Sequence, residues 1–211
     1  MKPISRYLAL MILAAAAQAQ SQADEEAFFG KIFAAMGIGT GSVVADIGTG
    51  PDPVHARRMA KIVGSSGKVV CVDITEAVIE QLRDMFKKEG VTNVEVRLGR
   101  TNDPTLPTGI FDAILVSLTY HEMVEHQAML DHIRLALKPS GRLVVIESIT
   151  DKRRKAPRAE QTQAHELAPD LLEAELLVGG FKVIRRIEPL RVIDGETKYL
   201  IVAVSNVVEK Q

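Results

Sequence analysis

Five short apolar runs, separated by segments with helical spacing, constrain the fold of this 211-residue chain more than any other feature. The runs are nearly continuously apolar, as in strands buried on both faces of a parallel sheet. Two more strands, at 181–187 and 197–205, are joined by a polar turn alone and must run antiparallel to each other. The pattern predicts an α/β fold, a Rossmann-like doubly wound sheet of seven strands, mostly parallel with one antiparallel strand near the C-terminus. The five runs span 42–47, 68–73, 94–98, 111–117 and 142–147.

Residues suited to helix termini mark the segments between these runs. Gly37 suits the end of a helix, Pro53 suits a first turn, and Thr75 suits an N-cap. Segment 151–160 is basic and contains a proline, so we expect a solvated loop there. The expected helices span 24–36, 53–61, 75–88, 122–137 and 169–178.

The first nineteen residues have the layout of a secretory signal peptide. Lys2 and Arg6 precede an apolar stretch at 7–17, and Ala17-Gln18-Ala19 fits a small-residue cleavage site. The stretch is shorter than the roughly 20 residues of a membrane span. We therefore expect a leader at 1–19, a domain at 20–211 without a stable membrane span, and a periplasmic or secreted protein. An alanine-rich leader on a cytoplasmic protein remains the alternative.

Composition argues against several classes of partner and site. The net charge is -1, aromatic residues make up 4%, and tryptophan is absent, so neither a basic face nor a stacking platform for nucleic acid is expected. The single cysteine, Cys71, excludes an internal disulfide and a multi-thiolate metal site. It is expected to be a small core residue. The oligomeric state cannot be determined from the sequence.

The segment Asp46-x-Gly48-x-Gly50 lies between the first apolar run and the helix that follows it. Glycines permit a sharp turn and a close approach of a ligand to the main chain, and the helix N-terminus beyond attracts a carboxylate. A dinucleotide-binding loop would need a third glycine at position 53, which is proline, so an NAD-dependent oxidoreductase is disfavoured. Taken alone, the glycine pair also fits an ordinary tight turn.

An acid ends the second strand, at Asp73. In doubly wound sheets an acid at this position faces the ligand crevice and can accept hydrogen bonds from ribose hydroxyls. A capping or solvated aspartate is the alternative, and the position at the strand end favours the ligand role.

Four segments, in order, resemble the motifs of the class I S-adenosylmethionine-dependent methyltransferases. They are 43–50 (VVADIGTG), 71–74 (CVDI), 111–116 (FDAILV) and 137–143 (LKPSGRL). The resemblance extends over about residues 25–205 and implies S-adenosylmethionine as the cofactor. It implies that Asp46, Gly48 and Gly50 border the methionine part. Asp73 would hold the ribose, and Ile74 would pack on adenine.

The expected cofactor site also includes Gly99, Asn102 and Ser117. The resemblance is weakest where this site would bind adenine. Many family members place an acid directly after the residue that matches Gly99, but this chain has Arg100 there. Arginine offers no acceptor to the adenine amino group. Asn102 or Asp103, from the same loop, could replace that acceptor.

The segment after the fourth strand, 117–122, carries the richest cluster of titratable side chains in the expected crevice. It resembles a Tyr-His pair of some small-molecule members of the family. His121 is the candidate base, because an imidazole titrates near neutral pH. Tyr120 and Glu122 could orient His121 or the acceptor. The structural alternative is that these side chains only cap a helix and line a wall.

The remaining histidines give no metal site by spacing. A zinc-binding helix places histidines four positions apart, whereas His126 follows His121 by five and would point about 140° away. The sequence therefore predicts no metal. His55 and His132 are expected on helix surfaces. His165 is expected to be a solvated loop residue, with a role on the acceptor side as the alternative.

Together these features predict a methyltransferase acting on an unidentified small-molecule acceptor. The alternative is an exported, non-catalytic binding protein with the same fold, because a leader would carry the chain away from the cytosol, where the cofactor is made.

Overall fold

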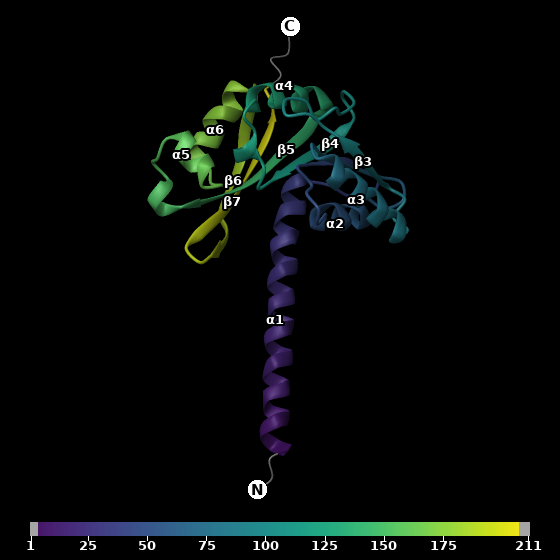
Figure 1. Ribbon diagram of the computed structural model, residues 1–211, viewed down its shortest axis with the longest axis vertical. Coiled ribbons are helices and arrows are strands. Elements are labelled where there is room, and N and C mark those ends of the chain that lie inside the picture. Colours follow the sequence, from purple (N-terminus) through teal and green to yellow (C-terminus); the bar gives the residue numbers. More distant parts are fainter. Residues whose placement is uncertain (1–3, 207–211) are drawn as a thin grey trace.

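A seven-stranded sheet forms the centre of the computed structural model, with the strand order β3-β2-β1-β4-β5-β7-β6 (Figure 1). The structure describes residues 4–206, and residues 4–10 and 12–17 only as part of a helix. β7 runs antiparallel to both β5 and β6, and the other pairs are parallel, so the prediction of one reversed strand is confirmed. The strands are β1 (Val43–Ile47), β2 (Lys68–Asp73), β3 (Val94–Leu98), β4 (Phe111–Ser117), β5 (Leu137–Thr150), β6 (Phe181–Ile193) and β7 (Glu196–Ser205).

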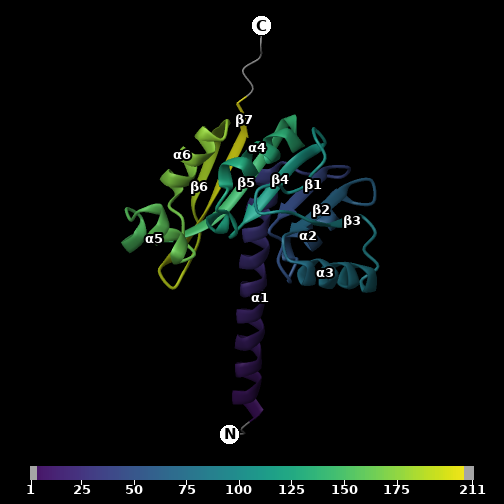
Figure 2. The same cartoon turned by 45° about the horizontal axis from the view of Figure 1, so that its top comes forward.

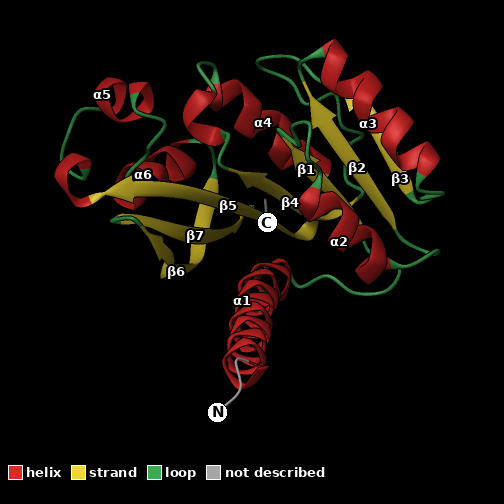
Figure 3. Cartoon of the chain, turned by 60° about the horizontal axis from the view of Figure 1, so that its bottom comes forward, coloured by secondary structure: helices red, strands yellow, loops and turns green. Residues whose placement is uncertain are grey.

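Helices cover both faces of the sheet. Successive β1 residues point to opposite faces, so Val44 packs with α1, α2 and α3, and Ala45 with α4 and α6. Figure 3 shows α1 and α2 on the side of the sheet opposite α4. The helices are α1 (Ile4–Met36), α2 (Val54–Val63), α3 (Glu76–Lys88), α4 (His126–Ala136), α5 (Arg158–Gln163) and α6 (Pro169–Val178), with 3-10 turns η1 (Tyr120–Glu122) and η2 (Asp151–Arg153).

The strand order reverses at β1, which lies between β2 and β4. In open α/β sheets a ligand crevice forms at this reversal, beyond the carboxyl ends of the strands. The glycine loop follows β1, Asp73 ends β2, and Ser117 ends β4. The topology therefore brings three segments that are distant in sequence to one edge of the sheet.

The first helix is longer than expected. α1 runs without a break from Ile4, whereas the sequence predicted a helix from residue 24, because the alanine-rich stretch itself has high helix propensity. Its first half projects away from the domain (Figures 1 and 2), and residues 18–27 are exposed. Lys2, the first basic residue of the expected leader, lies outside the described residues. None of the helices in residues 4–206 combines the length and the apolar character needed to cross a bilayer.

The second half of α1 is anchored to the domain. Arg58 of α2 forms ion pairs with Glu25 (2.8 Å) and Glu26 (2.6 Å). Arg191 of β6 lies over the ring of Phe28, 4.1 Å from its centroid. Among residues 18–36 of α1, the first buried side chain is that of Phe29. The globular domain therefore begins a few residues after the expected leader.

The helix expected at 122–137 is divided in two. The turn η1 ends at Glu122, and α4 begins only at His126. Met123 is extended, with φ -75° and ψ 103°, which interrupts helical hydrogen bonding at that residue. His121 and Glu122 therefore lie on a short turn beside the crevice, and not on the helix.

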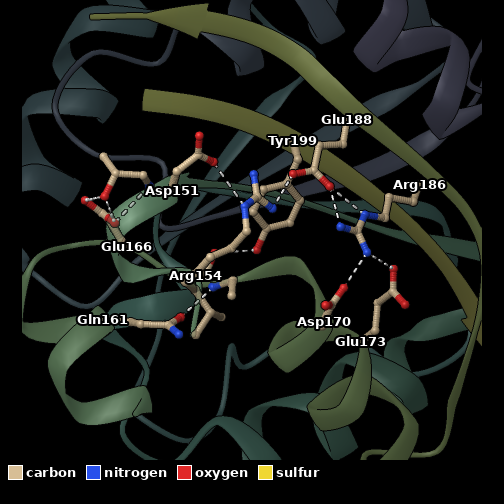
Figure 4. Close-up of polar contacts among 12 residues, drawn as sticks. Asp151, Arg154, Gln161, Glu166, Asp170, Glu173, Arg186, Glu188 and Tyr199 are labelled. Carbon is tan, nitrogen blue, oxygen red and sulfur yellow. Dashed lines mark hydrogen bonds and ion pairs between the residues drawn. The ribbon is translucent and has the colours of Figure 1, made fainter. Parts of the chain in front are cut away.

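The expectation of a solvated loop at 151–160 is wrong in part: many of its residues are exposed, but the segment forms η2 and the start of α5, and its arginines are paired. Arg153 forms an ion pair with Glu166 (2.5 Å), and Arg154 forms one with Glu188 of β6 (2.6 Å). Figure 4 shows Arg154 and Glu188 within a wider network of such contacts. These pairs hold η2 and α5 against the end of the sheet.

Histidine and cysteine positions outside the crevice were predicted with mixed success. His55 is not a free surface residue: its ring packs edge-on against Phe29, with centroids 5.4 Å apart. Burial and the nearby positive charges of Arg58 and Lys198 lower the pKa of His55 to about 4. His132 is exposed, as expected. Cys71 is buried in the core, as expected, and burial raises its pKa.

Candidate functional site

A cavity of about 530 Å³ lies at the carboxyl ends of β1, β2 and β4. Gly48, Gly50, Asp73, Ile74 and Ser117 line it, so five of the residues predicted from the sequence to bind a cofactor surround one space. Its volume lies within the range of pockets that enclose small ligands, about 300–1,000 Å³.

The glycine loop has a backbone that other residues rarely adopt. Gly48 has φ +74° and Gly50 has φ +66°. A side chain at position 48 would meet Thr119, with a Cβ-to-Cγ2 distance of 2.3 Å, whereas no atom lies within 4 Å of the corresponding Cβ position at Gly50. Gly48 therefore permits close packing against Thr119, just after β4. Gly50 leaves its backbone open beside the cavity.

The carboxylate of Asp73 is fixed by backbone donors at the edge of this cavity. Its Oδ2 accepts the N–H of Gly50 (3.0 Å), and its Oδ1 accepts the N–H of Thr75 (3.0 Å). A carboxylate has about four acceptor positions, so each oxygen retains capacity for a further hydrogen bond. Next to it, Ile74 is 58% exposed and presents an apolar surface to the cavity. A pair of ligand hydroxyls and an apolar ring would both be accommodated here.

Asp46 differs from the other residues of the predicted cofactor set. It is buried, none of the residues in 4–206 donates a hydrogen bond to its carboxyl, and it does not line the cavity. Burial raises the pKa of Asp46 to about 7. Burial thus favours the protonated form of this acid, which lies directly before the glycine loop.

On the adenine side, the expected substitute acceptors point elsewhere. The amide of Asn102 donates to Glu125 (3.4 Å), and the carboxylate of Asp103 accepts a hydrogen bond within its own loop. Neither these residues nor Gly99 line the cavity, whereas Arg100 does. Arg100 and Thr101, and not an acidic side chain of this loop, therefore border this end.

Glu147 is a site residue that the sequence did not single out. It lies near the carboxyl end of β5, is fully buried, and accepts hydrogen bonds from the backbone N–H of His121 (3.1 Å) and from its ring Nδ1 (2.8 Å). Burial by itself lowers the pKa of His121, but the hydrogen bond to Glu147 and the charges of Glu147 and Glu122 together raise it. An acid near the end of a buried strand beside β4 was the available sequence signal.

The three residues of the predicted catalytic set take different positions. Tyr120 is fully buried and packs against His126, with ring centroids 5.9 Å apart, and burial raises its pKa. The side chain of His121 is 5% exposed, and that of Glu122 is 59% exposed. Of the three, only Glu122 lines the cavity.

A second histidine lies next to His121, and it is not the one nearest in sequence. The ring of His165 meets that of His121 edge-on, with centroids 5.5 Å apart at 85°. His165 Nδ1 lies 3.8 Å from Glu122 Oε1. His126, in contrast, faces Glu175 at 3.7 Å. The segment after α5 therefore brings His165 beside His121 and Glu122, and His165 is itself 75% exposed, as expected for a solvated loop residue.

Comparison with known proteins agrees with this architecture. The family model of a methyltransferase domain matches residues 38–180. The chain is 33% identical over 112 residues to the ubiquinone/menaquinone biosynthesis C-methyltransferase UbiE of Hydrogenovibrio crunogenus, covering 53% of this chain and 44% of that protein. It therefore spans less than half the length of such curated relatives.

Solved structures show the same fold. An S-adenosylmethionine-dependent methyltransferase from Aquifex aeolicus superposes with a TM-score of 0.71 at 26% identity, over 84% of this chain and 89% of that one. The [4+2]-cyclase SpnF superposes with a TM-score of 0.73 at 15% identity, over 89% of this chain and 83% of that one, which shows the fold alone.

The cavity also fits the cofactor of this family. Asp73 presents a fixed carboxylate, Ile74 an apolar surface, and Gly50 an unobstructed backbone to one space of suitable volume. The domain match extends over most of the chain, from before β1 to the end of α6. The chain therefore belongs to the class I S-adenosylmethionine-dependent methyltransferases.

Proposed function

We propose that this protein transfers a methyl group from S-adenosylmethionine to a small-molecule acceptor. The observation that carries the proposal is the Asp73 carboxylate, fixed by Gly50 and Thr75 at the wall of the cavity beside the exposed Ile74. When bound, S-adenosylmethionine supplies an activated methyl group on its sulfonium sulfur. Holding an acceptor in line with that methyl group provides much of the rate acceleration.

On the cofactor side, Asp73 would accept hydrogen bonds from the ribose hydroxyls, and Ile74 would pack on the adenine. Arg100 lines the same end of the cavity, and a guanidinium can stack on an aromatic face. We therefore assign adenine binding to apolar contact and stacking, in place of an acidic acceptor for its amino group.

On the acceptor side, Glu122 borders the cavity with His121 behind it. When the Nδ1–H of His121 donates to Glu147, its Nε2 carries a free lone pair that can accept a proton or bind an ion. A small acceptor is supported by the near-neutral net charge of the chain, and by the name of the UbiE relatives, which places them in quinone biosynthesis.

The proposal includes export of the chain. Residues 1–19 have the layout of a leader, and residues 4–19 lie in the part of α1 that projects from the domain (Figure 1). A periplasmic or secreted protein is proposed, with a cytoplasmic one as the alternative.

Calorimetric titration of the full chain with S-adenosylhomocysteine, which has the same nucleoside and no methyl group to transfer, tests the cofactor site. We expect micromolar binding, weakened at least tenfold by Asp73→Ala and unchanged by Asp84→Ala, a matched exposed acid on α3. Absence of binding at millimolar concentration would overturn the proposal.

Transfer is tested separately, by incubating the protein with methyl-labelled cofactor and a small-molecule extract. Label in a small-molecule product supports the proposal. Cofactor binding without any transfer would favour the non-catalytic alternative.

A further inference from the structure

We propose that His121, Glu122 and His165 form a binding site for a divalent transition-metal ion at the edge of the cavity. Each of the three side chains offers one ligand atom, and these atoms all lie within 4.8 Å of one another. Glu122 Oε1 is 3.8 Å from His121 Nε2 and 3.8 Å from His165 Nδ1. Two residues come from the turn after β4, and the third comes from the segment after α5, so the site exists only in the folded chain.

The strongest indication is the unpartnered nitrogen of His121. Its side chain is only 5% exposed, and Nε2 is buried without a hydrogen-bond partner among the described residues. An unpartnered buried polar atom costs about 1–3 kcal/mol and calls for an explanation. A bound ion would supply the missing partner.

Glu147 provides what a ligating histidine needs on its other side. Metal-binding histidines almost always donate their second ring N–H to a carboxylate or carbonyl, which fixes the tautomer and the orientation of the ring. Here Nδ1 of His121 lies 2.8 Å from the buried Glu147, so Nε2 is the nitrogen left to face the cluster.

An ordinary hydrogen-bonded cluster does not account for this arrangement. A contact of 3.8 Å between an imidazole nitrogen and a carboxylate oxygen is too long for a hydrogen bond. Glu122 thus lies between two histidines and bonds to neither. Ligands about 2.1 Å from a tetrahedral ion are roughly 3.4 Å apart, so small side-chain rotations would close the site.

His165 is held in position by its neighbours and not by the cluster itself. Its backbone has φ +57°, which is uncommon for a residue other than glycine, and its N–H donates to Thr162 O (3.0 Å). The two residues that follow are also anchored. The carboxylate of Glu166 accepts a hydrogen bond from the hydroxyl of Thr150, and the backbone oxygen of Leu167 accepts one from the hydroxyl of Tyr199 (2.9 Å). Figure 4 shows Glu166 and Tyr199 in this anchoring network.

The donor set indicates the class of ion. Two imidazoles and one carboxylate suit zinc, iron(II), cobalt or nickel, whereas magnesium and calcium prefer oxygen ligands throughout. Three protein ligands also leave at least one coordination position open, as in catalytic metal sites.

The open coordination position would lie beside the cavity, because Glu122 belongs to the ion site and also lines the cavity. An acceptor hydroxyl or thiol bound there would have its pKa lowered by the ion. This last consequence rests on the proposed methyl transfer, whereas ion binding itself does not.

The test is a titration of the full chain, prepared without a histidine tag and freed of metal by a chelator, with Co²⁺ followed by competition with Zn²⁺. We expect one ion per chain, with micromolar or tighter affinity and the visible absorption of cobalt bound by nitrogen ligands. His165→Ala should weaken binding at least a hundredfold. His165 is 75% exposed, so this variant retains the fold.

Two further variants sharpen the result. His132→Ala, a matched exposed histidine on α4, should bind the ion as the unmodified protein does. Glu147→Gln should weaken binding about tenfold to a hundredfold, because it removes the carboxylate that orients His121.

The proposal is overturned if no stoichiometric binding occurs, or if His165→Ala binds as tightly as the unmodified chain. Titration with S-adenosylhomocysteine in the same samples separates this outcome from failure of the proposed function. Absence of ion binding in samples that still bind S-adenosylhomocysteine would refute the metal site alone.

Discussion

The Nδ1 atom of His121 lies 2.8 Å from the carboxylate of Glu147, and this contact joins the turn after β4 to the neighbouring strand β5. Glu147 also accepts the backbone N–H of His121, so one buried carboxylate fixes both the ring and the main chain. The position of the imidazole at the edge of the cavity is therefore set by β5 as much as by its own segment.

The double acceptor role makes Glu147→Gln destabilising. A glutamine has only one acceptor oxygen, so its NH2 group would face one of the two donors of His121. We expect the free energy of unfolding at pH 7 to fall by about 1–3 kcal/mol in urea titrations. Glu122→Gln is the control in metal-free protein, since Glu122 is exposed and should change stability by less than about 0.5 kcal/mol. Equal effects of the two substitutions would contradict the prediction.

Asp46 makes stability depend on pH. Burial raises its pKa in the folded state to about 7, above the value near 4 of an unfolded chain, so the folded protein holds the proton more tightly. This stabilisation is present at low pH and is lost as the pH rises through about 7. As the pH rises from 5 to 8, the free energy of unfolding of the unmodified protein should therefore fall by up to about 3 kcal/mol relative to that of Asp46→Asn. Urea unfolding at both pH values measures the difference; a constant difference would contradict the assignment.

His55 has the opposite pH dependence. Its folded pKa is about 4, below the ordinary value of 6.5, so the unfolded chain takes up the proton first. The stability this provides is complete above about pH 6.5 and is lost as the pH falls towards 4. As the pH falls from 7 to 5, the free energy of unfolding of the unmodified protein should decrease by about 2 kcal/mol more than that of His55→Gln. His132→Gln, at an exposed position, should follow the unmodified protein, and a similar effect there would exclude burial as the cause.

The first nineteen residues should be dispensable for folding. Among residues 18–36 of α1, the first buried side chain is that of Phe29, and residues 18–27 are exposed. A chain that starts at Gln20 should have the same melting temperature, within about 2 °C, and the same affinity for S-adenosylhomocysteine as the full chain. In a bacterial host, mass spectrometry of the periplasmic fraction should find Gln20 as the first residue. Uncleaved protein in the cytoplasm would support the cytoplasmic alternative.

The sheet and the cofactor wall were largely determined by local sequence. The bounds of β2, β3, β4 and α6 agree with those expected, because continuous apolar runs and terminal glycines or prolines act over a few residues. Gly48, Gly50, Asp73, Ile74 and Ser117 meet at one cavity because each lies at or just after the carboxyl end of a parallel strand, and the topology brings those ends together.

The acceptor side was decided by tertiary packing. Neighbouring positions gave no sign that Tyr120 would turn into the core while Glu122 reached the cavity. Nor could spacing show that His165, which precedes the ion-paired Glu166, would lie beside His121, whose ring contacts the buried Glu147. A side chain's partner across elements depends on how those elements pack, and that information is spread over the whole chain. The motif of strand, glycine loop and acid was thus legible in the sequence alone, whereas the cluster of two histidines and two acids exists only in the folded structure.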